Sequence, residues 1–425
     1  MQTAPVSALA ARIRSAEGDA FLTALYGEDE LELQRQRYLC ALAAFEARFG
    51  QREVIVLSVP GRTEICGSHT DHQQGRVLAG SITLDTLCVA SPRDDLQVNL
   101  VSEGHRDTVL ELEDLTPEES EQGRASALVR GVAAGIASSG IPLWGFDAYT
   151  TSRIPSGGGF SSSAAFEVLL GALFCALGDD MLSVPELARI AQQAENVWYG
   201  KPCGLMDQYA CALGGVAGLD FRNLLRPEVE MIDFEFEEHG YALCAVELGA
   251  SHSDLTADFA AIPAEMGMVA QRFGLRVLRF VEQEEFEEKL PLLERELPAR
   301  AILRARHFFD ENERVLRMAE ALRQGVMDAC RREMLASGES SRRLLQNIVP
   351  DSKPDELALV RALERSAELL GERGAWRVHG GGFGGSMQAL LPLDMLEDYR
   401  REMDALFGSG AVKQLRIRPR GPVIF

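Results

Sequence analysis

The sequence Thr-Ser-Arg-Ile-Pro-Ser-Gly-Gly-Gly-Phe-Ser-Ser-Ser-Ala-Ala occupies residues 151–165, between a β-favouring segment at 147–154 and an apolar run at 164–177. Its glycines allow a tight turn and a close approach of the backbone to a ligand. Its serines stand where a helix should begin, so free N–H groups and the positive end of the helix dipole would face the loop. This arrangement is typical of a phosphate site, although a plain glycine turn with a serine cap is the simpler alternative. Neither a Walker loop nor the dinucleotide fingerprint fits the spacing.

The composition is that of a large acidic protein. At 425 residues, 46% of them hydrophobic, the chain is long enough for two domains with their own cores. The formal net charge of −21 argues against nucleic acid as a partner, because phosphate backbones attract basic surfaces. Without a membrane-length apolar run or a signal peptide, we expect a cytoplasmic protein that does not bind membranes. The eight cysteines include no Cys-x-x-Cys pair and are expected to be reduced.

The order of apolar segments predicts a mixed α+β chain. Residues 1–50 are expected to be helical, 54–59 and 77–91 to be strands, and 125–138 and 185–198 to be helices. Charged residues become frequent near 222–240, which predicts one domain over 1–225 and a second over 226–425. The second domain is expected to begin with a strand at 241–248 and to be mostly helical over 256–335 and 344–349.

Two further segments suggest a ligand site. Arg62, His69, Asp71 and His72 crowd one polar, loop-rich segment between strands, which favours polar-ligand binding over a solvated turn, and their spacing matches no specific metal pattern. Residues 380–385 contain five glycines in six positions before an apolar strand, and such density lets backbones approach a ligand or each other. Together with the first loop, this segment predicts a functional cleft between the domains.

Four stretches, in order, resemble the galactokinase branch of the GHMP small-molecule kinases. Residues 60–72 resemble its sugar-binding signature and 155–164 its phosphate-binding loop. Residues 194–208 resemble the segment that carries its magnesium ligand and catalytic aspartate, and 380–386 its third glycine-rich motif. The resemblance spans residues 60–386 and leaves the first fifty residues outside. It implies the two-domain GHMP kinase fold, with the active site in the interdomain cleft.

The resemblance also implies ATP-dependent transfer of a phosphoryl group to the anomeric hydroxyl of a sugar. Asp207 would be the catalytic base, beside Arg62, whose charge favours an ionised carboxylate and stabilises the transferred group. Mg²⁺ would bind Ser163 and Glu195, a hydroxyl and a carboxylate suited to a hard cation. The loop that would bind the ATP phosphates comprises Gly157, Gly158, Gly159, Phe160, Ser161, Ser162 and Ser163, and Ser102 aligns loosely with a nucleotide contact. The residues assigned to the sugar are Ser68, His69, Thr70, Asp71 and Phe259.

The chain departs from the family pattern around the ligands. Ser68 replaces the glutamate expected to bind the 6-hydroxyl of the sugar, and Phe259 replaces a tyrosine. A buried hydroxyl without its acceptor costs about 1–3 kcal/mol, so either Ser68 substitutes or the substrate differs there. In addition, Glu64 stands where asparagine is usual.

These departures leave D-galactose as the leading substrate, with galacturonate, arabinose and fucose as alternatives. A serine at position 68 would not repel a carboxylate at C6 of a uronic acid. A non-catalytic sugar-sensing regulator on the same fold is a further alternative, disfavoured because Arg62, Glu195 and Asp207 are all present. Sugar and ATP are the expected partners; the sequence leaves the oligomeric state open and is compatible with a monomer.

Overall fold

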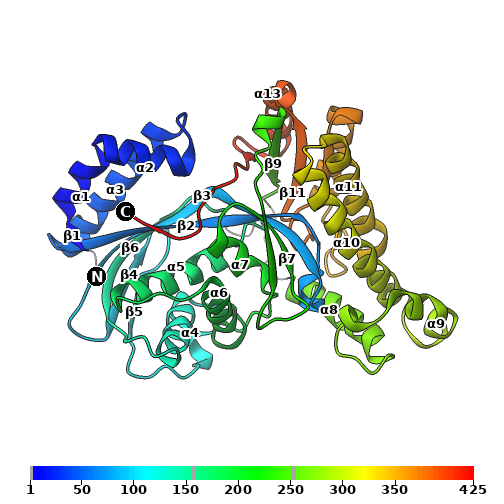
Figure 1. The fold of residues 1–425 in the computed structure, drawn as a ribbon, viewed down its shortest axis with the longest axis horizontal. Helices are drawn as coiled ribbons and strands as arrows, with labels where there is room; N and C mark the ends of the chain where they lie inside the picture. Colours follow the sequence, from blue (N-terminus) through cyan, green and yellow to red (C-terminus); the bar gives the residue numbers. More distant parts are fainter. Residues whose placement is uncertain (1–2, 156–158, 250–254) are drawn as a thin grey trace.

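Two long paired strands, β2 (Glu53–Cys66) and β3 (Arg76–Pro92), form the centre of the first of two sheets (Figure 1). The computed structural model describes residues 3–155, 159–249 and 255–425. The order of this sheet is β1-β2-β3-β6-β4-β5, with β13 on β2, β7 on β3 and β8 on β7. Strands β4 and β6 pair in parallel, and the other described pairs are antiparallel. The other strands are β1 (Ala4–Pro5), β4 (Gln97–Ser102), β5 (Thr108–Glu111), β6 (Phe146–Ser152), β7 (Val216–Asp220), β8 (Glu228–Ile232) and β13 (Val423–Ile424).

Helices cover both faces of this sheet, as the period-2 alternation of strand side chains requires. Val54 and Val56 pack against α1 (Val6–Ile13), α2 (Ala16–Tyr26) and α3 (Leu31–Phe49). Ile55 and Leu57 belong to the cluster on the opposite face, with α4 (Ala125–Ser138) and α5 (Ser162–Leu177). That side also carries α6 (Val184–Gln193) and α7 (Met206–Leu213) (Figure 1). The π-helix η3 (Ala194–Tyr199) follows α6 and contributes Ala194 to the same cluster.

The second sheet has the order β10-β11-β9-β12, and all its pairs are antiparallel. Its strands are β9 (Tyr241–Glu247), β10 (Ala375–Val378), β11 (Ser386–Pro392) and β12 (Val412–Gln414). One face packs on α12 (Ala358–Leu370) and α13 (Leu396–Phe407), and the other on α10 (Ala299–Arg323) and α11 (Met327–Ser340). A separate apolar cluster joins α8 (Thr256–Gln271) and α9 (Gln283–Glu296) to α10.

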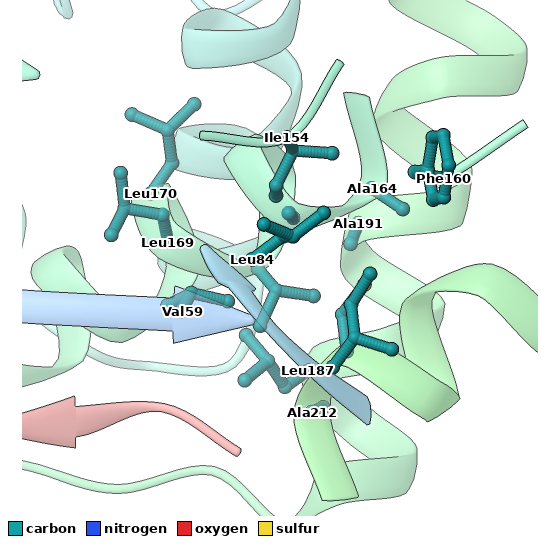
Figure 2. Close-up of a cluster of buried hydrophobic side chains, with 14 of the residues drawn as sticks. Val59, Leu84, Ile154, Phe160, Ala164, Leu169, Leu170, Leu187, Ala191 and Ala212 are labelled. Carbon is teal, nitrogen blue, oxygen red and sulfur yellow. The ribbon is translucent and has the colours of Figure 1, made fainter. Parts of the chain in front are cut away.

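Helix α5 begins directly after the glycine-rich loop and is buried along most of its length. Figure 2 shows the apolar cluster around it, in which Ile154 and Phe160, on either side of the loop, both take part. Phe160 is fully buried. The loop is therefore anchored at both ends in the core, which fixes where the free N–H groups of α5 point.

Most predicted segments are confirmed, with four differences. Within the segment 1–50, expected to be helical, Ala4–Pro5 form the short strand β1, which pairs with β2. Strand β2 continues to Cys66, so Arg62 lies in a strand and the polar loop begins only at Gly67. The helix expected at 344–349 ends at Leu345, the last residue of the π-helix η6 (Ser341–Leu345). Strands β8 and β13 lie beyond residue 225 yet pair in the first sheet, and the division at 225/226 stays a prediction.

Two expectations from composition can be compared with the structure. All eight cysteines lie in the described residues, and none is disulfide-bonded. Within the part of the chain that the structure describes, no helix is long and apolar enough to span a membrane.

Candidate active site

Arg62 and Asp207, 145 positions apart in the chain, form an ion pair. Nε of Arg62 donates to Oδ1 of Asp207 at 2.7 Å, and Nη1 donates to the carbonyl oxygen of Gly159. The arginine side chain is 5% exposed and that of the aspartate 26%. Asp207 lies in the first turn of α7, where the helix dipole favours a negative charge. A fixed cation and a solvent-accessible carboxylate thus meet beside the glycine-rich loop.

The end of the glycine-rich loop contacts this pair directly. The hydroxyl of Ser161 donates to Oδ2 of Asp207, so both carboxylate oxygens have partners. Ser161 precedes α5 with φ of 58°, and Gly159 has φ of 74°, both in the left-handed region. Of the predicted phosphate-binding residues, Gly157 and Gly158 lie outside the described residues.

The two glycine-rich segments lie against each other, as the sequence suggested. A Cβ on Gly380 would lie 3.3 Å from Cα of Gly159, so a side chain there would crowd the facing backbone. The His379 ring packs on Phe160 with centroids 5.1 Å apart and is hydrogen-bonded to Thr63 of β2 at 3.0 Å. The second segment therefore holds the end of the predicted phosphate loop against β2.

The predicted metal ligands are also neighbours. The hydroxyl of Ser163 donates to Oε1 of Glu195 at 2.9 Å, and Nζ of Lys201 lies 2.8 Å from the same oxygen. Nε2 of Gln208 bridges Oε2 of Glu195 and Oε2 of the buried Glu167, at 3.1 Å each. Burial and the nearby Glu195 charge raise the pKa of Glu167 well above its usual value. The neutral form of Glu167 is thus favoured, while Oε1 of Glu195 faces the ammonium group of Lys201.

Asp71 lies beside the start of α7. Its Oδ1 accepts from the backbone N–H of His72 at 2.8 Å, and its Oδ2 accepts from that of Met206 at 3.4 Å. Burial, followed by the charge of Asp207, raises the pKa of Asp71 to about 6. A Cβ on Gly204 would lie 1.6 Å from Oδ2 of Asp71, so only glycine leaves room for this carboxylate.

In the predicted sugar loop, residues 67–71, the side chains of His69 and Thr70 are bonded within the protein, whereas the buried Ser68 hydroxyl has no described partner. Ser68 and Thr70 are fully buried, and the Thr70 hydroxyl is within 2.8 Å of the Gly67 carbonyl oxygen. Nε2 of His69 lies 2.9 Å from the carbonyl oxygen of Gly381, which can only accept, so this nitrogen carries the proton. Burial lowers the pKa of His69, and its other nitrogen lies 3.3 Å from Nε2 of His72. Both ring nitrogens of His69 therefore already have partners.

Phe259 and Ser102 lie in different surroundings. The half-buried Phe259 packs edge-to-face on Phe383, and a Cβ on Gly381 would lie 2.6 Å from its ring. The Ser102 hydroxyl is hydrogen-bonded to that of Thr150 at 2.9 Å, and no described interaction joins it to the phosphate loop. The roles assigned to both residues stay predictions.

The unusual Glu64 has a partner that explains how it is tolerated. It forms a buried ion pair with Nη2 of Arg377 on β10, and both side chains are at most 3% exposed. Although burial raises the pKa of Glu64, Arg377 and Arg62 oppose that rise. The pair joins β2 of the first sheet to β10 of the second.

Comparisons with known proteins agree with this geometry. Two family models match the chain: the galactokinase galactose-binding signature over residues 43–92, and the GHMP kinases N terminal domain over 127–215. The galactokinase of Actinobacillus pleuropneumoniae serotype 5b (strain L20) is 32% identical over 372 residues, which cover 85% of this chain and 91% of that protein. The galactokinase of serotype 3 (strain JL03) matches over the same shares at 32% identity. The chain belongs to the galactokinase family.

Membership of this family of GHMP kinases makes the chain an ATP-dependent sugar kinase. The fold agrees: the crystal structure of Lactococcus lactis galactokinase complexed with galactose matches with a TM-score of 0.77. That match has 24% identity and covers 90% of this chain and 98% of the other. A mevalonate kinase structure matches with a TM-score of 0.60 and 15% identity, over 85% of this chain and 99% of that one. The predicted α+β GHMP kinase fold is confirmed.

Several residues around the site were not singled out by sequence reasoning. Lys201 and Gln208 lie inside the matched motif at 194–208, so their position in the sequence could have identified them as residues near the site. Glu167 lies in a run expected to be core helix, where a carboxyl among apolar residues is itself unusual. Glu311 and His307 of α10 contact Gly67 and Ser68 of the predicted sugar loop, yet their helix carries no motif that we recognised.

Proposed function

We propose that this kinase transfers the γ-phosphoryl group of ATP to the anomeric hydroxyl of D-galactose, giving galactose 1-phosphate and ADP. The observation that carries the proposal is the Arg62–Asp207 ion pair, which is joined to the phosphate loop through Gly159 and Ser161. Further support comes from the galactose-binding signature and from the relatives named galactokinase.

In the proposed mechanism, Asp207 is the base. Its Oδ1 is held by Arg62, so Oδ2 is the atom that would receive the proton of the anomeric hydroxyl, in place of the bond from Ser161. As the sugar oxygen bonds to the γ-phosphorus, the bond to the ADP oxygen breaks and the proton stays on Asp207. Arg62 is nearly buried and held by both Asp207 and Gly159, so its charge is fixed where negative charge develops.

Ser163 and Glu195 would hold Mg²⁺. Their hydroxyl and carboxylate are hard oxygen donors, and the ammonium of Lys201 at Oε1 of Glu195 indicates that this oxygen favours a cation. Among the described residues no three His, Cys, Asp or Glu side chains form a metal cluster, which is compatible with Mg²⁺ because that ion usually takes one or two protein carboxylates plus phosphate oxygens. Bound there, Mg²⁺ would neutralise charge on the β- and γ-phosphates.

We assign the sugar hydroxyls chiefly to Asp71. Its carboxylate is half-buried and close enough to Asp207 for the two charges to interact, so a ligand at one would lie near the other. The neighbouring Ser68, His69 and Thr70 would shape the loop around the sugar, with Phe259 as an apolar surface. The burial of Ser68 and Thr70 limits them to contacts that need little accessible area.

A related sugar is the second candidate substrate, and the hydrogen bonds of His69 support it. Because both His69 nitrogens are bonded within the protein and Phe259 has no hydroxyl, these two positions offer fewer free polar groups than the family pattern implies. A substrate that lacks or replaces the 6-hydroxyl, such as arabinose, fucose or galacturonate, would in addition lose little by the replacement of the usual glutamate by Ser68.

A panel of sugars separates these candidates. ADP release would be measured with galactose, galacturonate, arabinose and fucose, and ³¹P NMR would identify the phosphorylated position. We expect galactose to give the highest kcat/KM, and Asp207→Ala to lower turnover by about 10²–10⁴-fold, the usual contribution of a positioned base. The exposed Asp328→Ala is the control. Absence of sugar-dependent ADP release would refute the kinase assignment, galactose among the poorest substrates would refute the choice of sugar, and normal turnover of Asp207→Ala would refute the mechanism.

A further inference from the structure

Helix α10 contacts the sugar loop from behind through a buried carboxylate. Oε1 of Glu311 accepts from the backbone N–H groups of Gly67 and Ser68, at 3.1 and 3.4 Å, and from the hydroxyl of Ser337 at 2.6 Å. Its Oε2 accepts from Nη1 of Arg314 on the same helix. Glu311 is fully buried, and Sγ of Cys66 also lies 3.5 Å from its Oε1, so its charge depends on partners within the protein.

A second side chain of α10 bonds the other backbone polar group of Ser68. Nε2 of the buried His307 donates to the carbonyl oxygen of Ser68 at 2.9 Å, which leaves Nδ1 to accept from the Ser340 hydroxyl at 2.8 Å. Both backbone polar groups of Ser68 are therefore bonded to α10, one to a carboxylate and one to a histidine.

The loop needs such support because its backbone is unusual. Gly67 has φ of 105° and His69 has φ of 56°, so Ser68 lies between two residues in the left-handed region. For histidine this conformation is unfavourable and persists only where the surroundings enforce it. The direction in which the chain leaves His69 sets the place of Asp71, two residues further on.

We propose that Glu311 and His307 are positioning residues that hold residues 67–71 in the conformation that binds the sugar. The inference rests on the proposed function, since it takes this loop as the sugar-binding loop. Neither residue has a described contact with Asp207, Glu195 or residues 159–163, so their loss acts on the sugar and leaves ATP binding intact.

Glu311→Gln tests the proposal with little change in shape. The glutamine side chain has an NH₂ group, a donor, in place of one carboxylate oxygen. This NH₂ group faces either the loop N–H groups or Arg314, so in both orientations it lies against another hydrogen-bond donor. We expect the KM for galactose to rise at least about tenfold, equivalent to about 1.4 kcal/mol, while the KM for ATP stays within about twofold. Glu320→Gln is the matched control: Glu320 lies on α10 and pairs with Arg323 at the same i,i+3 spacing, but on the surface.

The outcomes are distinguishable from those of the proposed function. If the unaltered enzyme phosphorylates no sugar, the proposed function fails. If it is active but Glu311→Gln keeps the galactose KM of Glu320→Gln, or loses ATP and galactose binding equally, the positioning role is overturned. Should Glu311→Gln fail to fold, Ser340→Ala decides, because it removes only the hydroxyl that donates to Nδ1 of His307 and helps to orient the ring. A rise in the galactose KM alone supports the role, and an unchanged KM overturns it.

Discussion

Replacing Asp71 by asparagine should make the protein more stable and the enzyme less active. The carboxylate is half-buried near Asp207, and these two features raise its pKa from 3.8 to about 6. Asp71 therefore binds its proton more tightly in the folded than in the unfolded protein. The stability that it contributes is fully present below pH 3.8 and is lost as the pH rises through about 6. At neutral pH the folded enzyme is therefore destabilised by the full free-energy cost of the ionised Asp71 carboxylate. In the proposed function this same carboxylate binds the sugar hydroxyls.

The size of that cost follows from the shift. The difference of about 2.2 between 6 and 3.8, at 1.36 kcal/mol per pKa unit, gives about 3 kcal/mol at neutral pH. The asparagine oxygen can still accept from the N–H of His72, but the long bond from Met206 is lost, at about 1 kcal/mol. Asp71→Asn should thus raise the free energy of unfolding by about 2 kcal/mol near pH 7.5, and by less than about 1 kcal/mol near pH 5.

Urea unfolding of the unaltered protein and Asp71→Asn at these two pH values measures the difference, and ADP release with galactose measures the loss of activity. Asp328→Asn, on an exposed helix turn, controls for the general effect of removing a negative charge. The reasoning is refuted if Asp71→Asn is no more stable near neutral pH, or if its gain is the same at both pH values.

Three further substitutions test other parts of the site. Gly204→Ala should raise the galactose KM at least about tenfold in initial-rate assays, because its methyl group would occupy the place of the Asp71 carboxylate; an unchanged KM would contradict the role of that carboxylate. Arg377→Met should lower the free energy of unfolding by about 3–5 kcal/mol in urea titrations, because it leaves Glu64 buried without its partner. Glu195→Gln should raise the Mg²⁺ concentration for half-maximal activity by roughly tenfold or more, and equal Mg²⁺ dependence in variant and parent would rule out the assigned ligand.

Local patterns were sufficient to predict much of the fold. The apolar run after the three serines became α5, and the helix expected over 125–138 matches α4. Strand β2 was predicted too short, since Arg62, Thr63 and Glu64 look like loop residues in sequence. Their polar groups are paired with Asp207, His379 and Arg377, all more than a hundred positions away, and no local pattern reveals such partners.

In the candidate site, too, some features could be predicted from the sequence and others could not. The motifs named Arg62, Asp207, Ser163 and Glu195, and the structure brings each pair within hydrogen-bonding distance. The engagement of His69 was not predictable, because its partner is the carbonyl oxygen of Gly381, a group that every residue type carries.

The sequence by itself determined the kind of protein: its glycine-rich loop, its acidic and basic side chains and their order identify a sugar kinase of the GHMP type. The sequence is sufficient for this because the contacts of a phosphate loop depend on local backbone freedom and on the start of a helix. Both properties are determined by residues that are neighbours in the sequence. Only the tertiary structure decided how the sugar loop is held, since Glu311 and His307 act on the backbone of Ser68 from about 240 positions away. Hydrogen bonds to a main chain leave no trace in the sequence of the segment that receives them, so the support of residues 67–71 became visible only in the folded chain.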